Sequence, residues 1–366
     1  MTVKKYLFFI SQNYSFAILR PIQYRALMRG DQVAWFVEGN AVDLTLFNQE
    51  EKRLVNVNDI FAFQPDAILY PANNAPTCLP GINVAVFHGF DAGKLDKKGN
   101  NDHYKDRHCF QLYCTQGPES TREFLALQSS PKSFNVIETG WSALDTLFTS
   151  DCAGGNHSAV STGAMEQDPD LLLSESKPTI LFCSTFSKRL SAAPHLMGKI
   201  KQLSETGRWN WLVQFHPKMS RDVVESYKNI QNDNLTFVET NDIIPLLKKA
   251  DVMVCDTSSV MLMFLLQHKP VVTFKNIAPK THLFDIKSPD ELEQAIGYAL
   301  TRPKKLMDSI QAFIDEVHPY RDGLSAERVL AAIDQTIEDK ASLAAHPKDF
   351  IRQLKMRKKL NYWRFW

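Results

Sequence analysis

The chain alternates short apolar runs with helix-like segments, and it does so in two separate blocks. In the first block, helices are predicted from Pro21 onward, where proline suits a first turn, and over residues 119–125. Apolar strands separated by helices are typical of a parallel sheet that is covered by helices on both faces. The predicted strands are residues 6–10, 32–37, 66–70, 83–87, 110–114 and 134–137.

The second block begins after residues 151–177, which are rich in Gly, Ser and Asp and are predicted to be a linker or excursion. Strands are predicted at residues 179–183, 211–215, 235–238, 252–255 and 270–274, and helices at residues 194–204, 243–247, 289–300 and 325–337. We therefore predict an α/β, GT-B-like fold. It has two Rossmann-like domains, residues 1–150 and 178–340, whose parallel sheets face a central cleft, and a tail at residues 341–366.

Composition narrows the class of function. The 366 residues include 42 Lys and Arg against 41 Asp and Glu, so no general attraction to nucleic acid is indicated. Six scattered cysteines without a CxxC pair indicate reduced thiols in a cytoplasmic protein rather than a zinc site. The first apolar run is too short for a signal peptide, and no run approaches a membrane span.

Three predicted strand ends in the second block carry groups that suit phosphate. They are Thr185 after the first strand, His216 and Lys218 after the second, and Asp256, Thr257, Ser258 and Ser259 after the fourth. Hydroxyls at a helix start cap free N–H groups, and those N–H groups also bind phosphate. An ordinary helix cap is the alternative for the last group, but the convergence of three strand ends favours an anion site.

His88 lies at a predicted strand end of the first block, directly before Gly89, which permits a tight turn. Imidazole is the commonest general base near neutral pH, so His88 is the candidate base. A histidine packed at the edge of a core is the alternative.

The tail differs from both blocks, because residues 348–366 place basic residues beside Tyr362, Trp363 and Trp366. It is predicted either to contact an anionic membrane surface or to strap one domain to the other.

The ordered set of motifs is similar to the CDP-glycerol glycerophosphotransferase family, which builds teichoic-acid-type glycerol phosphate polymers. The motifs are Phe87-His88-Gly89, Phe215-His216-Pro217, residues 256–260 and residues 320–329, with further likeness at residues 115–125 and 138–141. The resemblance spans about residues 80 to 335 and implies a GT-B fold whose second domain holds most of the donor nucleotide.

The resemblance also implies roles for single residues. His88 would deprotonate an acceptor hydroxyl that attacks the β-phosphate of the donor, with CMP as the leaving group. His216, Ser258 and Ser259 would contact the donor diphosphate. Asp322 and Arg328 match the closing segment of the family and would help to hold the donor.

Two departures from the family pattern concern the donor. The family has Pro-Thr-Trp-Arg where this chain has Ser184-Thr185-Phe186-Ser187, so the threonine is kept and the arginine is not, unless Lys188 or Arg189 replaces it. A Pro-Gly-Pro segment expected after Asp285 is missing.

No Asp-x-Asp pair follows a strand, which favours a mechanism with no metal and no cofactor, in which histidine, hydroxyls and a helix start neutralise the leaving phosphate.

These observations predict a transferase that moves glycerol phosphate, or a related polyol phosphate, from a CDP-activated donor to a lipid-linked or glycan acceptor. It would act in cell-envelope polymer synthesis, in the cytoplasm or on the inner face of the cytoplasmic membrane. The alternatives are a GT-B glycosyltransferase that uses a nucleotide sugar, an epimerase of the same fold, and a non-catalytic nucleotide-binding or assembly protein.

Overall fold

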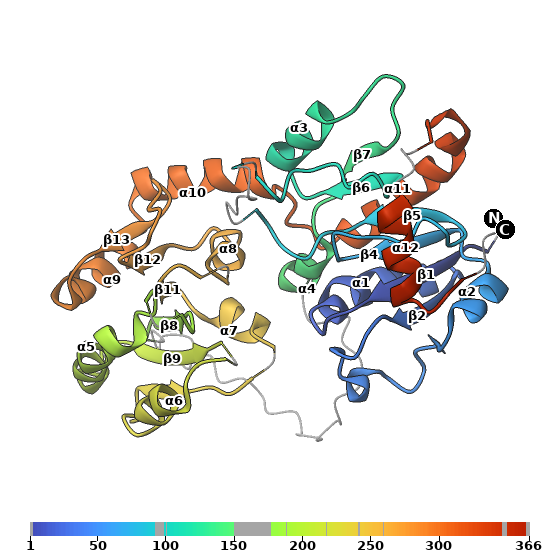
Figure 1. Cartoon of the computed structure of the whole chain (residues 1–366). Helices are drawn as coiled ribbons and strands as arrows, with labels where there is room; N and C mark the ends of the chain where they lie inside the picture. The colour runs from blue at the N-terminus through green and yellow to red at the C-terminus, as the bar shows by residue number, and fades with distance from the viewer. Residues whose placement is uncertain are drawn as a thin grey trace, which may run out of the picture. The chain divides into compact units, whose positions relative to one another are not determined.

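The computed structural model describes residues 3–91, 99, 101–149, 177–187, 189–216, 218–240, 242–258, 260–345 and 350–363. The chain divides into two compact units. Unit 1 consists of Met1–Thr149 and Asp315–Trp366, and unit 2 consists of Ser150–Ile314. Each unit contains one parallel sheet with helices on both faces, which confirms the predicted α/β class (Figure 1).

Within the described residues, the sheet of unit 1 has the strand order β3-β2-β1-β4-β5-β6-β7, and all its neighbours pair in parallel. All six predicted strands are present, and the short β3 was not predicted. The strands are β1 (Lys5–Ile10), β2 (Gln32–Val37), β3 (Arg53–Leu54), β4 (Ala67–Tyr70), β5 (Ile82–Ala85), β6 (Leu112–Thr115) and β7 (Asn135–Glu138).

Helices cover the two faces of this sheet with different parts of the chain. α1 (Ser15–Met28) and α11 (Ser325–Asp339) pack on one face, where Leu19 and Leu330 are fully buried in the same cluster. α2 (Val57–Phe63) and α3 (Pro118–Ala126) contribute Ile60 and Phe124 to the cluster on the other face. The orange α11 therefore lies among the blue elements of the N-terminal region in Figure 1.

The first helix corrects one prediction. α1 begins at Ser15, so Pro21 lies inside the helix and not in its first turn. Proline removes one helical hydrogen bond, but Phe16, Ile18 and Leu19 ahead of it are buried in the core of unit 1. Burial of these side chains extends the helix upstream of the proline.

The described sheet of unit 2 has the order β10-β9-β8-β11-β12-β13, again with parallel neighbours. The strands are β8 (Thr179–Ser184), β9 (Asn210–Phe215), β10 (Leu235–Phe237), β11 (Val252–Cys255), β12 (Val271–Phe274) and β13 (Phe284–Ile286). The helices are α5 (Ala193–Glu205), α6 (Arg221–Lys228), α7 (Ile244–Lys249), α8 (Val260–Leu265), α9 (Leu292–Leu300) and α10 (Lys304–Val317), which ends in unit 1. α5, α6 and α9 share one apolar cluster with the strands.

The division of the chain differs from the predicted boundary at residue 340. Residues 315–340 belong to unit 1, because Ala326, Val329 and Ile333 of α11 are buried against its sheet and α1. The predicted linker, residues 151–177, lies outside the described residues except for Lys177. The predicted central cleft concerns the placement of one unit relative to the other, and it stays a prediction.

The tail forms α12 (Phe350–Lys359), which packs on unit 1. Arg352 donates hydrogen bonds to the Arg107 carbonyl and, at 2.9 Å, to Asn74 Oδ1. Tyr362 stacks on Phe61 of α2, with ring centroids 5.2 Å apart. In the part of the chain that the structure describes, no helix is long and apolar enough to cross a membrane.

Candidate active site

His88 is presented by a sharp turn after β5. Phe87 has φ +54°, in the left-handed region that a phenylalanine rarely adopts and that needs support from its surroundings. Trp141 gives part of that support, because its Nε1–H donates to the Phe87 carbonyl at 3.3 Å. The turn leaves the imidazole of His88 exposed at the carboxyl end of the sheet.

The hydrogen bond of His88 defines which nitrogen can act as a base. Its Nδ1 lies 3.2 Å from the Pro71 carbonyl oxygen. A carbonyl oxygen can only accept, so Nδ1 carries the proton in the bonded neutral ring and Nε2 keeps its lone pair. The ring of Tyr14 lies beside the imidazole, with centroids 5.7 Å apart. His88 is thus oriented to take a proton from a hydroxyl at Nε2.

Side chains from the neighbouring strand ends form a wall beside His88. Phe90 packs edge to face on Trp141, which follows β7, at a centroid distance of 5.3 Å. Gln116, which follows β6, donates from Nε2 to the Gly89 carbonyl at 3.1 Å. Loops from three adjacent strands therefore hold the His88-Gly89-Phe90 turn in place.

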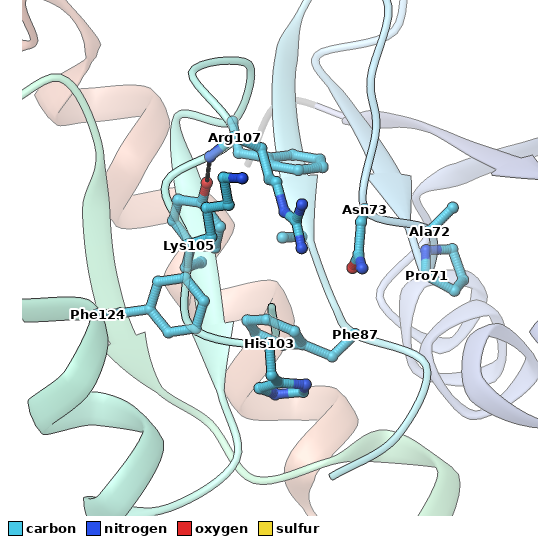
Figure 2. Close-up of a pocket in the computed structure, with 11 residues that line it drawn as sticks. Pro71, Ala72, Asn73, Phe87, His103, Lys105, Arg107 and Phe124 are labelled. Atoms are coloured by element: carbon cyan, nitrogen blue, oxygen red, sulfur yellow. Dashed lines mark hydrogen bonds between the residues drawn. The ribbon is translucent and has the colours of Figure 1, made fainter. Parts of the chain in front are cut away.

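A small basic pocket lies on the same edge of the sheet, lined by Pro71, Ala72, Asn73, Ala85, Phe87, His103, Lys105, Arg107, Phe110, Tyr113 and Phe124. Figure 2 shows the side chain of Arg107 extending toward Asn73. His103 stacks on Phe87 at 5.5 Å, and burial lowers the pKa of His103. The cavity volume is about 10 Å³, which suits about one water molecule rather than a substrate.

In unit 2, Asp256 ties the strand ends together instead of facing outward. Its side chain is only 1% exposed and accepts hydrogen bonds from Ser184 Oγ at 2.6 Å, from Thr185 N at 3.0 Å and from Ala192 N at 2.9 Å. Burial raises the pKa of Asp256 despite these bonds. The carboxylate thus joins the end of β11 to the loop after β8 and to the start of α5.

The hydroxyl residues after β11 are nearer to solvent than Asp256. Thr257 and Ser258 are partly exposed. Thr257 Oγ1 accepts from Ile277 N at 3.3 Å, and the Ser258 carbonyl accepts from Met261 N at 3.2 Å in the first turn of α8. Ser259, the remaining candidate of this group, lies outside the described residues.

His216 has the opposite arrangement of nitrogens from His88. Its Nδ1 accepts the backbone N–H of Lys218 at 3.0 Å, so in the neutral ring the proton sits on Nε2. Burial and then the nearby Lys218 charge lower the pKa of His216. Phe186, from the loop after β8, packs against the imidazole with ring centroids 4.6 Å apart, and Lys218 Nζ lies 5.8 Å from the centroid of the Phe186 ring. The loops after β8 and β9 are therefore in contact, and the loop after β9 offers a hydrogen-bond donor, His216 Nε2–H, and a cation, Lys218.

A groove of about 550 Å³ adjoins His216. This volume is in the range of small-molecule sites. The groove is lined by Gln214, Phe215, His216, Val224, Phe237, Val238, Glu239 and Thr240. Glu239 and Thr240 were not predicted as site residues. Both directly follow a predicted strand, and this position is the signal that could have identified them.

Asp322 and Arg328 belong to unit 1, as His88 does. Arg328 pairs with Asp322, with Nη1 3.2 Å from Oδ1, and lies over the ring of Tyr320 at 4.2 Å. The Tyr320 hydroxyl donates to Glu138 Oε1 at 2.7 Å. The two segments that resemble the family at residues 138–141 and 320–329 are thus in contact, although no sequence pattern marked Glu138 or Tyr320 individually.

Residues 113–335, more than half of the chain, match the family described as CDP-Glycerol:Poly(glycerophosphate) glycerophosphotransferase. The chain belongs to this family. The suspected resemblance is therefore confirmed, and the protein is a transferase of the glycerophosphotransferase class. A comparison with curated proteins finds no match.

Solved structures similar to the chain share its fold at low identity. A putative UDP-N-acetylglucosamine 2-epimerase from Listeria monocytogenes has a TM-score of 0.61 and 14% identity, covering 95% of this chain and 100% of that one. MnaA of S. aureus, solved with UDP, has a TM-score of 0.59 and 15% identity, with the same coverage. The wall teichoic acid polymerase TagF, soaked with CDPG, has a TM-score of 0.60 and 13% identity, covering 92% of this chain and 89% of that one.

Proposed function

We propose that the protein transfers glycerol phosphate, or a related polyol phosphate, from a CDP-activated donor to an acceptor hydroxyl. The acceptor oxygen bonds to the β-phosphorus, the bond from that phosphorus to the oxygen bridging to CMP breaks, and CMP leaves. His88 Nε2 takes the proton of the attacking hydroxyl. The geometry of His88 carries the proposal, because a histidine whose Nδ1 is held by a carbonyl presents an oriented base.

The donor diphosphate is assigned to the strand ends of unit 2. His216 donates from Nε2, and Lys218 supplies positive charge without a metal ion. Thr185, Thr257 and Ser258 offer hydroxyl groups at adjacent strand ends, and Ser259 is the next hydroxyl residue in the sequence. The groove beside His216 is of suitable size for the nucleoside of the donor.

Two of the candidate acidic residues act by positioning in this proposal. Asp256 is buried and already bonded to backbone and hydroxyl donors, so it holds the donor loops and does not touch phosphate. Asp322 orients Arg328, whose guanidinium is the group that contacts the anionic substrate.

The acceptor is a hydroxyl at the end of a lipid-linked or glycan chain, and the product is a teichoic-acid-like polymer of the cell envelope. The family description, which names poly(glycerophosphate), supports a polymeric acceptor. The fold shared with TagF, which is named a wall teichoic acid polymerase, agrees with this.

Two histidine variants test the assigned roles. His88→Ala is expected to abolish transfer while the affinity for CDP-glycerol, measured by calorimetry, stays within about twofold, since the base acts only in the chemical step. His216→Ala is expected to weaken that affinity roughly tenfold. His108→Ala, an exposed histidine of unit 1, is the control. Full activity of both test variants would refute the assignment.

We also propose that α12 brings the protein to the inner face of the cytoplasmic membrane. Leu354 is 54% and Trp363 47% exposed, and Lys355 and Lys358 are exposed beside them. Exposed apolar and basic side chains in one segment suit an anionic bilayer. Arg352 and Tyr362, by contrast, pack on unit 1 and anchor the helix.

A surface variant tests this better than removal of the tail, which would also strip packed residues from unit 1. Lys355→Glu with Lys358→Glu should lower sedimentation with phosphatidylglycerol vesicles several-fold, without loss of turnover on a soluble acceptor. Lys304→Glu with Lys305→Glu makes the same change in charge on exposed positions of α10 and is the control. Equal vesicle binding by both variants would exclude α12 as the membrane contact.

A further inference from the structure

The last residue of α10, Val317, and His318 directly after it belong to unit 1 and pack tightly on the wall of the His88 site. A Cβ atom on Gly117, after β6, would lie 2.4 Å from the Val317 carbonyl oxygen. A Cβ on Gly140, after β7, would lie 3.1 Å from His318 Nε2, and Gly140 also has φ +77°. At position 117 only glycine avoids this clash, and at position 140 the contact with His318 is tighter than an ordinary Cβ contact, so residues 317 and 318 lie directly against these two loops.

His318 is buried in this contact and acts as a neutral acceptor. Its side chain is 1% exposed, and its Nε2 accepts the backbone N–H of Trp141 at 2.9 Å. Burial lowers the pKa of His318 to about 4, and the backbone of His318 and Tyr320 offsets only part of this. Of the charged groups around it, Arg328 lowers the pKa and Asp322 raises it.

Trp141 connects this acceptor to the candidate base. Its indole Nε1–H donates to the carbonyl of Phe87, and that carbonyl belongs to the peptide bond that precedes His88. Phe87 is the residue with the unfavourable positive φ. The ring of Phe90 packs edge to face on Trp141 at 5.3 Å and on His318 at 6.0 Å, which completes the wall.

We propose that His318 is a positioning residue for His88 and acts through Trp141. By accepting the Trp141 N–H it fixes the backbone of Trp141, whose indole then holds the Phe87 turn that aims the imidazole of His88. The proposal rests on the assignment of His88 as the base. The hydrogen bonds that link His318, Trp141 and Phe87 all lie within unit 1. Substitutions at these residues are therefore expected to slow the chemical step and to leave donor binding unchanged.

Three substitutions separate positioning from folding. Gln at position 318 can place an acceptor oxygen close to the position of Nε2, whereas Leu is of similar size and has no acceptor. His318→Leu and Trp141→Phe are expected to lower kcat roughly tenfold to a hundredfold with an unchanged KM for CDP-glycerol. His318→Gln should keep most of the wild-type kcat. The double variant H318L/W141F should be no slower than the slower single variant, because both act on one path.

A spectroscopic readout makes the test independent of turnover. In ¹H–¹⁵N spectra of the imidazole rings, the Nδ1 proton of His88 should be observable in the wild type and in H318Q, and should be lost to exchange in H318L and W141F. The proposal would be overturned if H318Q lost as much kcat, or as much of this signal, as H318L does. A wild-type kcat in H318L would also overturn it. If H318L does not fold, the comparison of W141F with H318Q still tests the proposal. If the wild type transfers no glycerol phosphate, the proposed function fails while the His88 spectra still test the link to His318.

Discussion

The two candidate catalytic histidines both leave Nε2 available, but in opposite protonation states. His88 donates from Nδ1 to a carbonyl, which leaves Nε2 as a base, whereas His216 accepts at Nδ1, which leaves Nε2–H as a donor. The same residue type is therefore prepared for two roles by one backbone group each. Sequence alone predicted both residues from their strand ends, but not their tautomers, because the partners are the Pro71 carbonyl and the Lys218 amide.

Phe186 gives a prediction at this scale. It packs on the imidazole of His216 and occupies the place of a tryptophan in the family pattern. Phe186→Ala is expected to raise the KM for CDP-glycerol roughly threefold to tenfold with little change in kcat, because the ring orients a donor-binding group. Steady-state kinetics measures both constants. A fall in kcat at constant KM would show that Phe186 acts on the chemical step instead.

At the scale of elements, the buried apolar strands were predictable because a short run of apolar residues is a strong signal. α2 was missed although Asn56 and Asp59 form a capping box at its start, and β13 was missed because only Ile286 of its three residues is fully buried. Asp256 was predicted as part of a phosphate cradle. Only the structure shows its carboxylate turned inward, because the donors come from residues more than sixty positions away in sequence.

Asp256 links β11, the loop after β8 and α5, so its removal should lower the stability of unit 2. Asp256→Ala leaves the hydroxyl of Ser184 and two backbone N–H groups without their acceptor and is expected to destabilise unit 2 by about 3 kcal/mol. Asp256→Asn keeps one acceptor oxygen and should lose less. Urea unfolding measures the difference, with the exposed Asp290→Ala as the control. Wild-type stability of D256A would contradict the anchoring role.

For the whole molecule, the return of residues 315–366 to unit 1 was the feature that sequence could not predict. The apolar pattern of α11 indicates one buried face, but the two sheets offer similar apolar surfaces, and periodicity does not say which sheet receives the helix. The packing of Val329 and Leu330 beside α1 settles this. As a result, Asp322 and Arg328 belong with His88.

Buried histidines make the fold sensitive to acid. The pKa of His318 is about 4 in the folded chain, below the ordinary value of 6.5, so between these values the unfolded chain binds the proton and stability falls as pH falls. From pH 7 to pH 5 the loss from His318 is about 2 kcal/mol. His282 of unit 2, whose pKa burial also lowers to about 4, acts in the same direction.

Urea unfolding of the wild type, H318Q and H108A at pH 7 and pH 5 measures this effect. H318Q should lose less stability than the wild type over this interval, whereas H108A keeps His318 and should not show this reduction. The same loss in all three proteins would show that His318 is not the group that titrates.

The fate of the β-phosphate tests the central claim most directly. CDP-glycerol labelled with ³²P at the β-position is incubated with the protein and a glycerol phosphate-primed lipid acceptor, and the products are separated. We predict that the label passes to the acceptor while unlabelled CMP is released in equal amount, and that His88→Ala does neither. Label remaining in released CDP would mean attack at carbon, as in sugar transfer, and would contradict the account.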